Sequence, residues 1–402
     1  MQFWAVCPFF LRKSRDMKVL FVINNFYLRG NGLCASARRT VHYLKEAGVD
    51  VRVLSGRNKD PEGPQPEYPL DDLNLPFVNG LVEAQGYQFA STDKDTIRAA
   101  VDWADLVHLE EPMVLEARTA IYARKTGKAI TATYHMHPEN MYASVGLDYS
   151  RTINWTTLNL WRDLIFNYCS HIQCPTQNVL DRLKRHRFKA ELHLISNGII
   201  PDPVRSTAMR DPDDKSFRIV NIGRLSNEKD QMTLLKAVSY SGHSRDLRLI
   251  FAGRGPEEEA YRKKAAELVE KGTLRYPPEF VFLDSRGLKD LAHTADLFVH
   301  CAYIEVEGLS CLESLREGVV PLIAKGKYSA TSQFALDHHS TFPAKDPKAL
   351  ARKIDWWIEH PERRMQMAPR YAALAAEYDI HKSIDALVDM FRKAIGERNQ
   401  HS

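Results

Sequence analysis

The sequence predicts a parallel α/β protein made of two Rossmann-like domains that face each other across a cleft. Short apolar runs alternate with helical patterns through both halves of the chain, as expected for parallel sheets covered by helices. The length of 402 residues is enough for two domains, each with its own core. Residues 198–216, rich in proline and aspartate, divide the two sets of runs and are typical of a hinge.

Each apolar run is expected to form one strand of a parallel sheet, with ligands at the carboxyl ends of the strands. In the first half the expected strands are Val19–Asn24, Val51–Ser55, Leu106–Glu110, Ile130–His135, Ile172–Thr176 and Leu192–Ser196. In the second half they are Arg218–Gly223, Leu247–Gly253, Phe280–Asp284, Leu297–Cys301 and Pro321–Ala324. The predicted domains are residues 17–197 and 217–375, followed by a last helical segment at 376–402.

The composition is that of a soluble globular protein, with 44% hydrophobic residues, 26% charged residues and a net charge of +4. This charge is too small to predict nucleic-acid binding. No run approaches the roughly 20 apolar residues that cross a bilayer. The six cysteines lack metal-binding spacings, which favours a reducing cytosol. Residues 1–16 are expected to be an extension upstream of a natural start at Met17 or, alternatively, a small interfacial anchor.

The segment Tyr303–Glu313 contains two glutamates, Glu305 and Glu313, with a glycine between them. It follows a predicted strand and begins a helical pattern, so one carboxylate lies on a turn and the other about two helical turns further along. Gly308 allows a ligand to approach the backbone, and a helix start offers N–H groups to an anion. Sugar nucleotides need carboxylates for their hydroxyls and backbone donors for their phosphates. A solvated helix face with two ordinary glutamates is the alternative.

The Glu305–Glu313 pair, with seven residues between its members, resembles the signature of retaining glycosyltransferases of family 4, which have the GT-B fold. The chain departs from the family pattern, because Glu305 is followed by V-E-G instead of G-F-G, and Gly318–Pro321 is one residue longer than G-x-P. These departures and the segment Lys327–Asp337 resemble a narrower branch that glycosylates membrane lipids, such as the diacylglycerol glucosyltransferases. The resemblance also implies that the last helix packs back on the N-terminal domain.

Arg224 and Lys229 lie five residues apart around a predicted strand-to-helix turn. Two cations there can stabilise a departing nucleoside diphosphate, which gains negative charge as the glycosidic bond breaks. In isolation they could be surface charges, but they resemble the family's G-R-L-x-x-x-K element. The resemblance implies that Glu313 holds the ribose hydroxyls, that Glu305 contacts the donor sugar, and that neither metal nor cofactor is needed. The implied donor site consists of Gly30, Gly32, Gly223, Arg224, Lys229, Gly253, Gly255, Glu305, Gly308, Leu309, Ser310 and Glu313.

His135 ends a predicted strand, where a side chain can reach an acceptor hydroxyl or a donor sugar. A lone histidine is usually structural, but His135 matches the strand-end histidine of the family, whereas His137 stays undecided. Gly30 and Gly32 precede an amphipathic helix and resemble the family's first glycine loop, although spaced as G-x-G. The implied catalytic residues are Glu305, His135, Arg224 and Lys229.

A helical stripe that includes Leu158, Trp161 and Ile165 is followed by the basic run Arg182–Lys189. Apolar surface beside cations suits an anionic membrane. A core-facing helix followed by a solvated basic helix end is the alternative. The predicted membrane-binding residues are Trp161, Arg182, Lys184, Arg185, Arg187 and Lys189.

The resemblance implies a retaining hexosyltransferase that moves glucose or galactose from UDP-glucose or UDP-galactose to a membrane lipid, diacylglycerol or ceramide. The enzyme is expected in the cytoplasm, peripherally bound to the inner face of the cell membrane, without a nucleic-acid partner. One alternative is a transferase of capsular or lipopolysaccharide glycan assembly. Another is an inactive GT-B protein with a regulatory or binding role, which would require the loss of donor-site residues that this chain retains.

Overall fold

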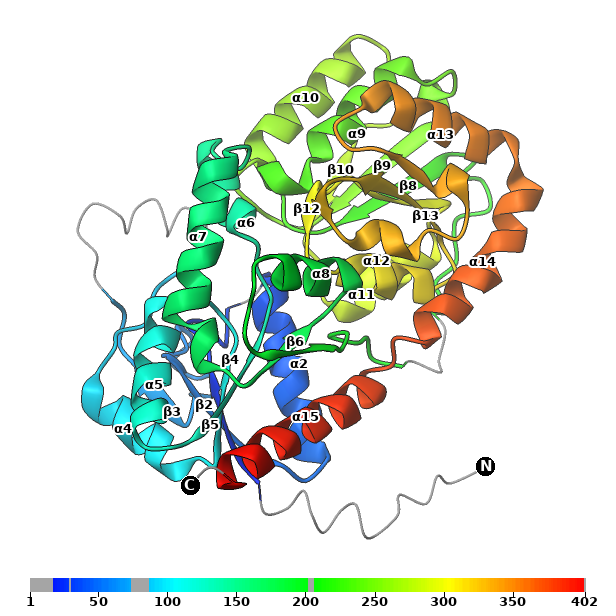
Figure 1. Ribbon diagram of the computed structural model, residues 1–402. Coiled ribbons are helices and arrows are strands. Elements are labelled where there is room, and N and C mark those ends of the chain that lie inside the picture. The colour runs from blue at the N-terminus through cyan, green and yellow to red at the C-terminus, as the bar shows by residue number, and fades with distance from the viewer. Residues whose placement is uncertain (1–16, 29, 74–86, 202–205, 401–402) are drawn as a thin grey trace, which may run out of the picture. The chain divides into compact units, whose positions relative to one another are not determined.

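The computed structural model describes residues 17–28, 30–73, 87–201 and 206–400, which form two units (Figure 1). Unit 1 contains the described residues up to 136, together with 151–197 and the C-terminal residues from 380 onward. Unit 2 contains 137–150 and the described residues of 198–379. The predicted extension or anchor at 1–16 lies outside the described residues.

Unit 1 is built on a seven-stranded parallel sheet with the strand order β3-β2-β1-β4-β5-β6-β7. Its strands are β1 (Lys18–Val22), β2 (Asp50–Gly56), β3 (Tyr68–Leu70), β4 (Leu106–Leu109), β5 (Ala129–Thr133), β6 (His171–Cys174) and β7 (Glu191–Leu194). Its helices are α2 (Gly32–Glu46), α4 (Lys94–Trp103), α5 (Val114–Lys125), α7 (Arg151–Leu164), α8 (Gln177–Arg185) and α15 (Ile380–Gln400). The sequence predicted all of these strands except β3, a short edge strand that includes a proline and shows no apolar run.

The last helix, α15, belongs to the core of unit 1. Ile384, Leu387 and Phe391 recur at helical spacing, are buried, and share a cluster with Phe21 of β1 and Val53 of β2. The prediction that the last helix packs back on the N-terminal domain is therefore confirmed. The helix spans Ile380–Gln400, within the predicted last segment at 376–402.

Unit 2 contains a six-stranded parallel sheet with the order β10-β9-β8-β11-β13-β15, and a two-stranded ribbon of β12 and β14. The strands are β8 (Phe217–Ile222), β9 (Leu247–Ala252), β10 (Glu279–Val281), β11 (Leu297–His300), β12 (Ile304–Glu305), β13 (Val320–Lys325), β14 (Tyr328–Ser329) and β15 (Thr341–Pro343). The helices are α6 (Pro138–Tyr142), α9 (Gln231–Ala237), α10 (Glu258–Glu270), α11 (Ser285–His293), α12 (Leu309–Arg316), α13 (Pro347–Glu359) and α14 (Pro361–Ala376). The two sheets confirm the predicted pair of Rossmann-like folds.

Residues 137–150 follow β5 of unit 1 in sequence but pack within unit 2, whereas the sequence analysis placed them in the N-terminal domain. They form α6 and a 3₁₀ turn at Ala143–Val145. Ala143 is buried in a small cluster with Tyr303 and Ile304. A segment this short has too few turns to show a periodicity that would indicate its packing partner.

Candidate functional site

Two turns of unit 2 lie at the same edge of its sheet. β8 and β11 are neighbouring parallel strands, so the turns that follow them emerge at their shared carboxyl ends. The backbone N–H of Tyr303 donates to the carbonyl of Glu228 at 3.1 Å and joins the two turns. The fold thereby brings together Lys229 on one turn and Glu305 on the other, as the sequence analysis expected.

Gly253 and Gly255 allow the turn after β9 to pack on the backbone of the turn after β8. A Cβ atom on Gly253 would lie 2.0 Å from the carbonyl oxygen of Gly223, and one on Gly255 would lie 2.1 Å from that of Leu225. Leu225 also donates its N–H to the carbonyl of Arg254 at 3.0 Å. The sequence analysis assigned these glycines to a nucleotide contact, but in the structure they are required first for packing of one turn on the other.

Lys229 and Glu305 form an ion pair with little exposure of either side chain. The Lys229 ammonium donates to Oε2 of Glu305, and Nε2 of His300 lies 3.6 Å from the same oxygen. Lys229 lies in a 3₁₀ turn after β8, and Glu305 ends β12. An ammonium has three donors, so Lys229 can hold Glu305 and still donate to a phosphate oxygen.

The ion pair keeps both members charged despite their burial. Burial alone would lower the pKa of Lys229, but the Glu305 carboxylate outweighs it and raises that pKa. Burial would likewise raise the pKa of Glu305, and the Lys229 cation reverses the direction. Burial lowers the pKa of His300 to about 4, so this ring is neutral near neutral pH. The Arg224 guanidinium is close enough to Lys229 to oppose the rise in the lysine pKa, which places a second cation nearby.

Gly308 begins α12 with a left-handed backbone, at φ of 96°, and Thr331 leaves no space for a side chain there. A Cβ atom on Gly308 would lie 2.4 Å from Oγ1 of Thr331. Thr331 belongs to the segment Lys327–Asp337, which is joined to Glu305 by the pairing of β12 with β14. The segment that resembles the lipid-glycosylating branch therefore lies directly against the Glu305 turn.

Helix α12 starts immediately after Gly308 and carries three of the predicted donor residues. Leu309 and Ser310 are in its first turn, where backbone N–H groups have no partner within the helix and suit an anion. Glu313 lies one turn further along and is half-buried. Its contact with ribose hydroxyls stays a prediction.

In the predicted glycine loop of unit 1, at Gly30 and Gly32, a side chain already binds some of the backbone N–H groups. Asn31, between Gly30 and Gly32, caps α2: its Oδ1 accepts from the N–H groups of Leu33 at 2.9 Å and Cys34 at 3.3 Å. Two of the N–H groups at this helix start are therefore already satisfied. The binding of donor by Gly30 and Gly32 stays a prediction.

His135 lies in a buried network of unit 1 that centres on Glu110. Nε2 of His135 is 2.7 Å from Oε2 of Glu110, and Nε2 of His108 is 3.1 Å from the other carboxylate oxygen. His108 also contacts the hydroxyls of Thr131 and Thr133 on the adjacent strand, at 2.8 and 2.9 Å. Burial would raise the pKa of Glu110, but the two histidines lower it to about 2, so the carboxylate is ionised. The sequence analysis found His135 and missed the carboxylate that holds it.

Two further buried carboxyl groups, Glu111 and Glu116, lie beside this network. The backbone N–H of Asn24 donates to Glu111 at 2.8 Å, and its side-chain amide donates to Glu111 at 3.1 Å and to Glu116 at 3.2 Å. The Tyr87 hydroxyl donates to Glu111. Burial, and for Glu116 also the neighbouring Glu111, raises the pKa of both carboxyl groups. These groups fix the chain at the end of β1.

The predicted membrane surface needs two corrections. Trp161 and Arg182 are each only 7% exposed, so neither can contact a membrane in this fold, and the stripe with Leu158 and Ile165 faces the core. The outer face of α7 instead exposes Trp155, Leu160 and Leu164, by 61%, 53% and 53%. The remaining predicted cations, Lys184, Arg185, Arg187 and Lys189, are exposed.

The C-terminal end of α7 lies next to these cations within unit 1. The Arg162 guanidinium of α7 donates to the carbonyl of His186, which follows α8, at 2.7 Å. Lys189 is near enough to Asp163 of α7 to help lower its pKa, after the larger effect of Arg162. Across the residues that the structure describes, no helix is long and apolar enough to cross a membrane.

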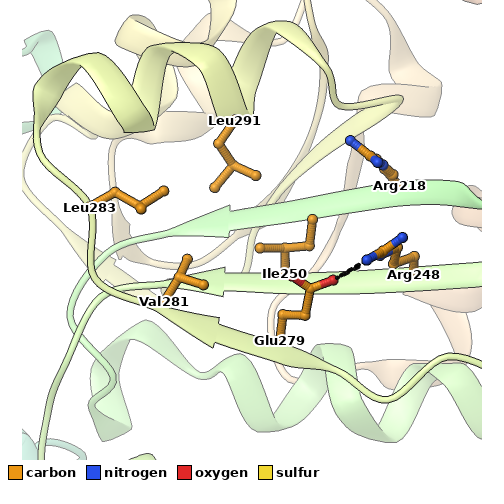
Figure 2. Close-up of a pocket in the computed structure, with 7 residues that line it drawn as sticks. All are labelled: Arg218, Arg248, Ile250, Glu279, Val281, Leu283 and Leu291. Atoms are coloured by element: carbon orange, nitrogen blue, oxygen red, sulfur yellow. Dashed lines mark hydrogen bonds and ion pairs between the residues drawn. The ribbon is translucent and has the colours of Figure 1, made fainter. Parts of the chain in front are cut away.

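A pocket lies elsewhere in unit 2, between α11 and the strands β8, β9 and β10 (Figure 2). Its charged lining residues are already paired: Arg248 donates to Glu279 at 2.8 Å, and Arg218 donates to Asp214 at 2.8 Å. These arginines lie near the amino ends of β8 and β9, away from the turns that carry Lys229 and Glu305. The pocket is therefore separate from the candidate site.

Comparison with known proteins finds two family models, one in each half of the chain. A family model described as glycosyl transferases group 1 matches residues 207–373, and one described as glycosyltransferase family 4 matches residues 30–202. An alpha-monoglucosyldiacylglycerol synthase of Streptococcus pneumoniae is 21% identical over 328 residues, which are 77% of this chain and 71% of that protein.

Two solved structures illustrate the range of structural likeness. HepE of Anabaena in complex with UDP-glucose has a TM-score of 0.68 at 16% identity, over 94% of this chain and 100% of that one. The catalytic domain of cholesterol-alpha-glucosyltransferase from Helicobacter pylori is 40% identical over 40% of this chain and 99% of that one, with a TM-score of 0.36.

Glu116→Gln should change how stability depends on pH. The pKa of Glu116 is raised in the folded state, so the unfolded chain releases this proton first, and the contribution of Glu116 to stability falls as pH rises above about 4.3. The glutamine variant has no group that titrates at this position. We expect its free energy of unfolding to gain on the wild type by up to about 1.4 kcal/mol per pH unit over part of the range between pH 4 and 8. Urea unfolding at a series of pH values measures this difference.

The matched control is Glu62→Gln, at an exposed loop position of the same unit. It should unfold in parallel with the wild type at every pH. Parallel curves for Glu116→Gln as well would show that Glu116 has an ordinary pKa.

Proposed function

The chain belongs to the family 4, or group 1, glycosyltransferases with the GT-B fold, and on this premise we propose that it is a retaining hexosyltransferase that transfers glucose or galactose from a UDP-sugar to a membrane lipid. The observation that supports this most directly is the buried Lys229–Glu305 ion pair, with the Arg224 cation nearby and the first turn of α12 following. Cations and a helix start at one edge of a sheet suit a leaving diphosphate.

In the proposed reaction the bond between the anomeric carbon and the diphosphate oxygen breaks, and the acceptor oxygen bonds to that carbon on the same face. The acceptor's hydroxyl proton goes to the departing diphosphate. Arg224 and Lys229 stabilise the charge that develops on the diphosphate, so they act more strongly in the transition state than in the ground state. Glu305 holds Lys229 in place and contacts the donor sugar, while Glu313 accepts from the ribose hydroxyls. These charges serve in place of a metal ion.

Two observations support a lipid acceptor. The pneumococcal relative is named an alpha-monoglucosyldiacylglycerol synthase, and its similarity extends over most of both chains. The segment Lys327–Asp337, which resembles the lipid-glycosylating branch, lies against the Glu305 turn through β14 and Thr331. We propose diacylglycerol or ceramide as the acceptor, at the inner face of the cell membrane.

Purified protein should transfer hexose from UDP-glucose or UDP-galactose to diacylglycerol or ceramide, with an α-linked product visible by NMR. Lys229→Ala should lower turnover by about 100-fold, because it removes a cation that stabilises the leaving group. The donor Michaelis constant should change less than turnover. Lys263→Ala, an exposed lysine on α10, is the control and should match the wild type.

If the wild type transfers hexose only to polyprenyl-linked glycans, the lipid acceptor is wrong and the enzyme assembles surface glycans. If Lys229→Ala keeps wild-type turnover and only binds donor less tightly, Lys229 anchors the ground state.

We infer that Glu110 acts by positioning His135. Because Nε2 of His135 lies against Glu110, the other ring nitrogen is the one that can meet a sugar or acceptor hydroxyl. Glu110→Gln keeps a hydrogen-bonding group but loses the charge, so turnover should fall about tenfold, the difference between a charge-assisted and a neutral hydrogen bond. The pH–rate profile should also shift, which a merely structural role would not produce. Glu62→Gln is the matched control, and an unchanged profile would remove Glu110 from the mechanism.

The protein is expected to bind vesicles of anionic lipid reversibly, through the exposed face of α7 and the cations after it. At 0.15 M salt the Debye length is about 8 Å, so only cations near the headgroups contribute, each about 1 kcal/mol. Flotation with anionic vesicles should weaken several-fold when four cations are replaced by glutamine. The four are Lys184, Arg185, Arg187 and Lys189.

Replacing Lys263 and Lys271, which are exposed on or just after α10 in unit 2, is the control and should leave flotation unchanged. Activity on a short-chain acceptor dispersed in detergent should survive in the fourfold variant. Equal binding to neutral and anionic vesicles, without dependence on salt, would show that these cations are only a solvated helix end.

A further inference from the structure

We propose that residues 143–149, here called the 143–149 loop, hold the hydrocarbon chain of the acceptor next to the donor site of unit 2. This inference rests on the proposed lipid acceptor and adds the surface that would bind it. The loop comes from the first half of the sequence but belongs to unit 2. Three of its side chains are apolar and exposed: Val145 by 49%, Leu147 by 45% and Tyr149 by 68%.

The loop is fixed to both turns that carry the candidate site. The side-chain amide of Asn227, two residues before Lys229, donates to the carbonyl of Ala143 at 2.8 Å. The ring of Tyr149 is stacked on that of Tyr303, two residues before Glu305, with centroids 6.2 Å apart and planes at 7°. A group bound on this loop is therefore held beside the Lys229–Glu305 pair.

Lys345 contacts both of the stacked tyrosines, Tyr149 and Tyr303. Its ammonium lies 3.5 Å from the ring centroid of Tyr303 and 4.5 Å from that of Tyr149, and it donates to the Tyr149 hydroxyl. Lys345 has a left-handed backbone, at φ of 64°, which is uncommon for a residue with a side chain and persists where surrounding structure holds it. Burial lowers the pKa of Lys345, partly offset by Asp148. The base of the loop is thus ordered, whereas its apolar side chains face outward.

The chemistry of the loop favours hydrocarbon over the other parts of a lipid. Between Ala143 and Leu147 it carries no charged side chain, and Asp148 is buried. Val145, Leu147 and Tyr149 alternate along the loop, and contiguous exposed apolar surface is typical of interaction sites. A transferred sugar must meet its acceptor hydroxyl at about 3–3.5 Å, so the chain attached to that hydroxyl has to lie just outside the donor turns. The 143–149 loop contacts both of these turns, through Ala143 and Tyr149.

The first test compares acceptors that share a headgroup and differ in chain length. For the double variant Val145→Ser with Leu147→Ser, the Michaelis constant for long-chain diacylglycerol in detergent should rise about tenfold, because buried apolar contact is lost. The constants for UDP-sugar and for a short-chain acceptor should stay within about twofold. The control is Met209→Ser with Met365→Ser, which removes two exposed apolar side chains of unit 2 outside the loop. Unchanged long-chain kinetics in the loop variant would overturn the proposal.

The second test detects contact without turnover. Leu147→Trp places an indole on the loop, and its fluorescence above the wild-type background should be quenched by diacylglycerol with brominated chains. Equally brominated phosphatidylcholine should quench far less. Equal quenching by both lipids would show general membrane contact and overturn the proposal, as would no quenching by either. Absence of transfer to any lipid by the wild type would defeat the proposed function, while the quenching result still decides whether the loop binds diacylglycerol.

Discussion

The Lys229–Glu305 ion pair is the interaction on which the candidate site of unit 2 depends. It joins a turn after β8 to the ribbon strand β12, and both side chains are largely removed from solvent. Removing one member of a buried pair leaves an uncompensated charge, which typically costs about 3–5 kcal/mol. The two side chains must therefore be held together by the packing of the turns that carry them. Gly253 packs against the backbone of the turn that leads to Lys229, and Gly308 packs against Thr331.

In unit 1, one buried carboxyl group is ionised and two neighbouring ones have raised pKa values. Glu110 stays ionised because two histidines donate to it, whereas Glu111 and Glu116 have raised pKa values because burial and, to a smaller extent, a neighbouring carboxylate disfavour charge. The three carboxyl groups are close together in sequence, but their different surroundings lower the pKa of one and raise the pKa of the other two. The ionised one faces His135, and the other two hold Asn24 at the end of β1. The negative charge therefore stays on Glu110, the carboxylate that orients the His135 ring.

The sequence predicted most strands of the two large sheets, because buried strands require apolar runs, and it singled out Lys229 and Glu305, which the fold brings together. It could not predict which side of α7 faces inward, since both faces carry apolar residues, and Trp161 proved to be core while Leu160 is exposed. It also missed the partner of His135. Glu110 reaches it only through the lateral alignment of β4 and β5, which pairs His108 with Thr131 and has no local signal in the sequence.

The donor half of the molecule is not one continuous piece of chain. The described residues of 198–379 carry Lys229, Glu305 and their supporting glycines, but the segment 137–150 contacts the turns on which Lys229 and Glu305 lie. Without that segment, the ring of Tyr303 would lose its stacked partner and the amide of Asn227 would lose the carbonyl that it binds. Both contacts lie within two residues of the ion pair. The geometry of the donor turns therefore depends partly on residues 137–150, which interrupt unit 1 in the sequence. A substitution in this segment can alter the site without replacing a charged residue.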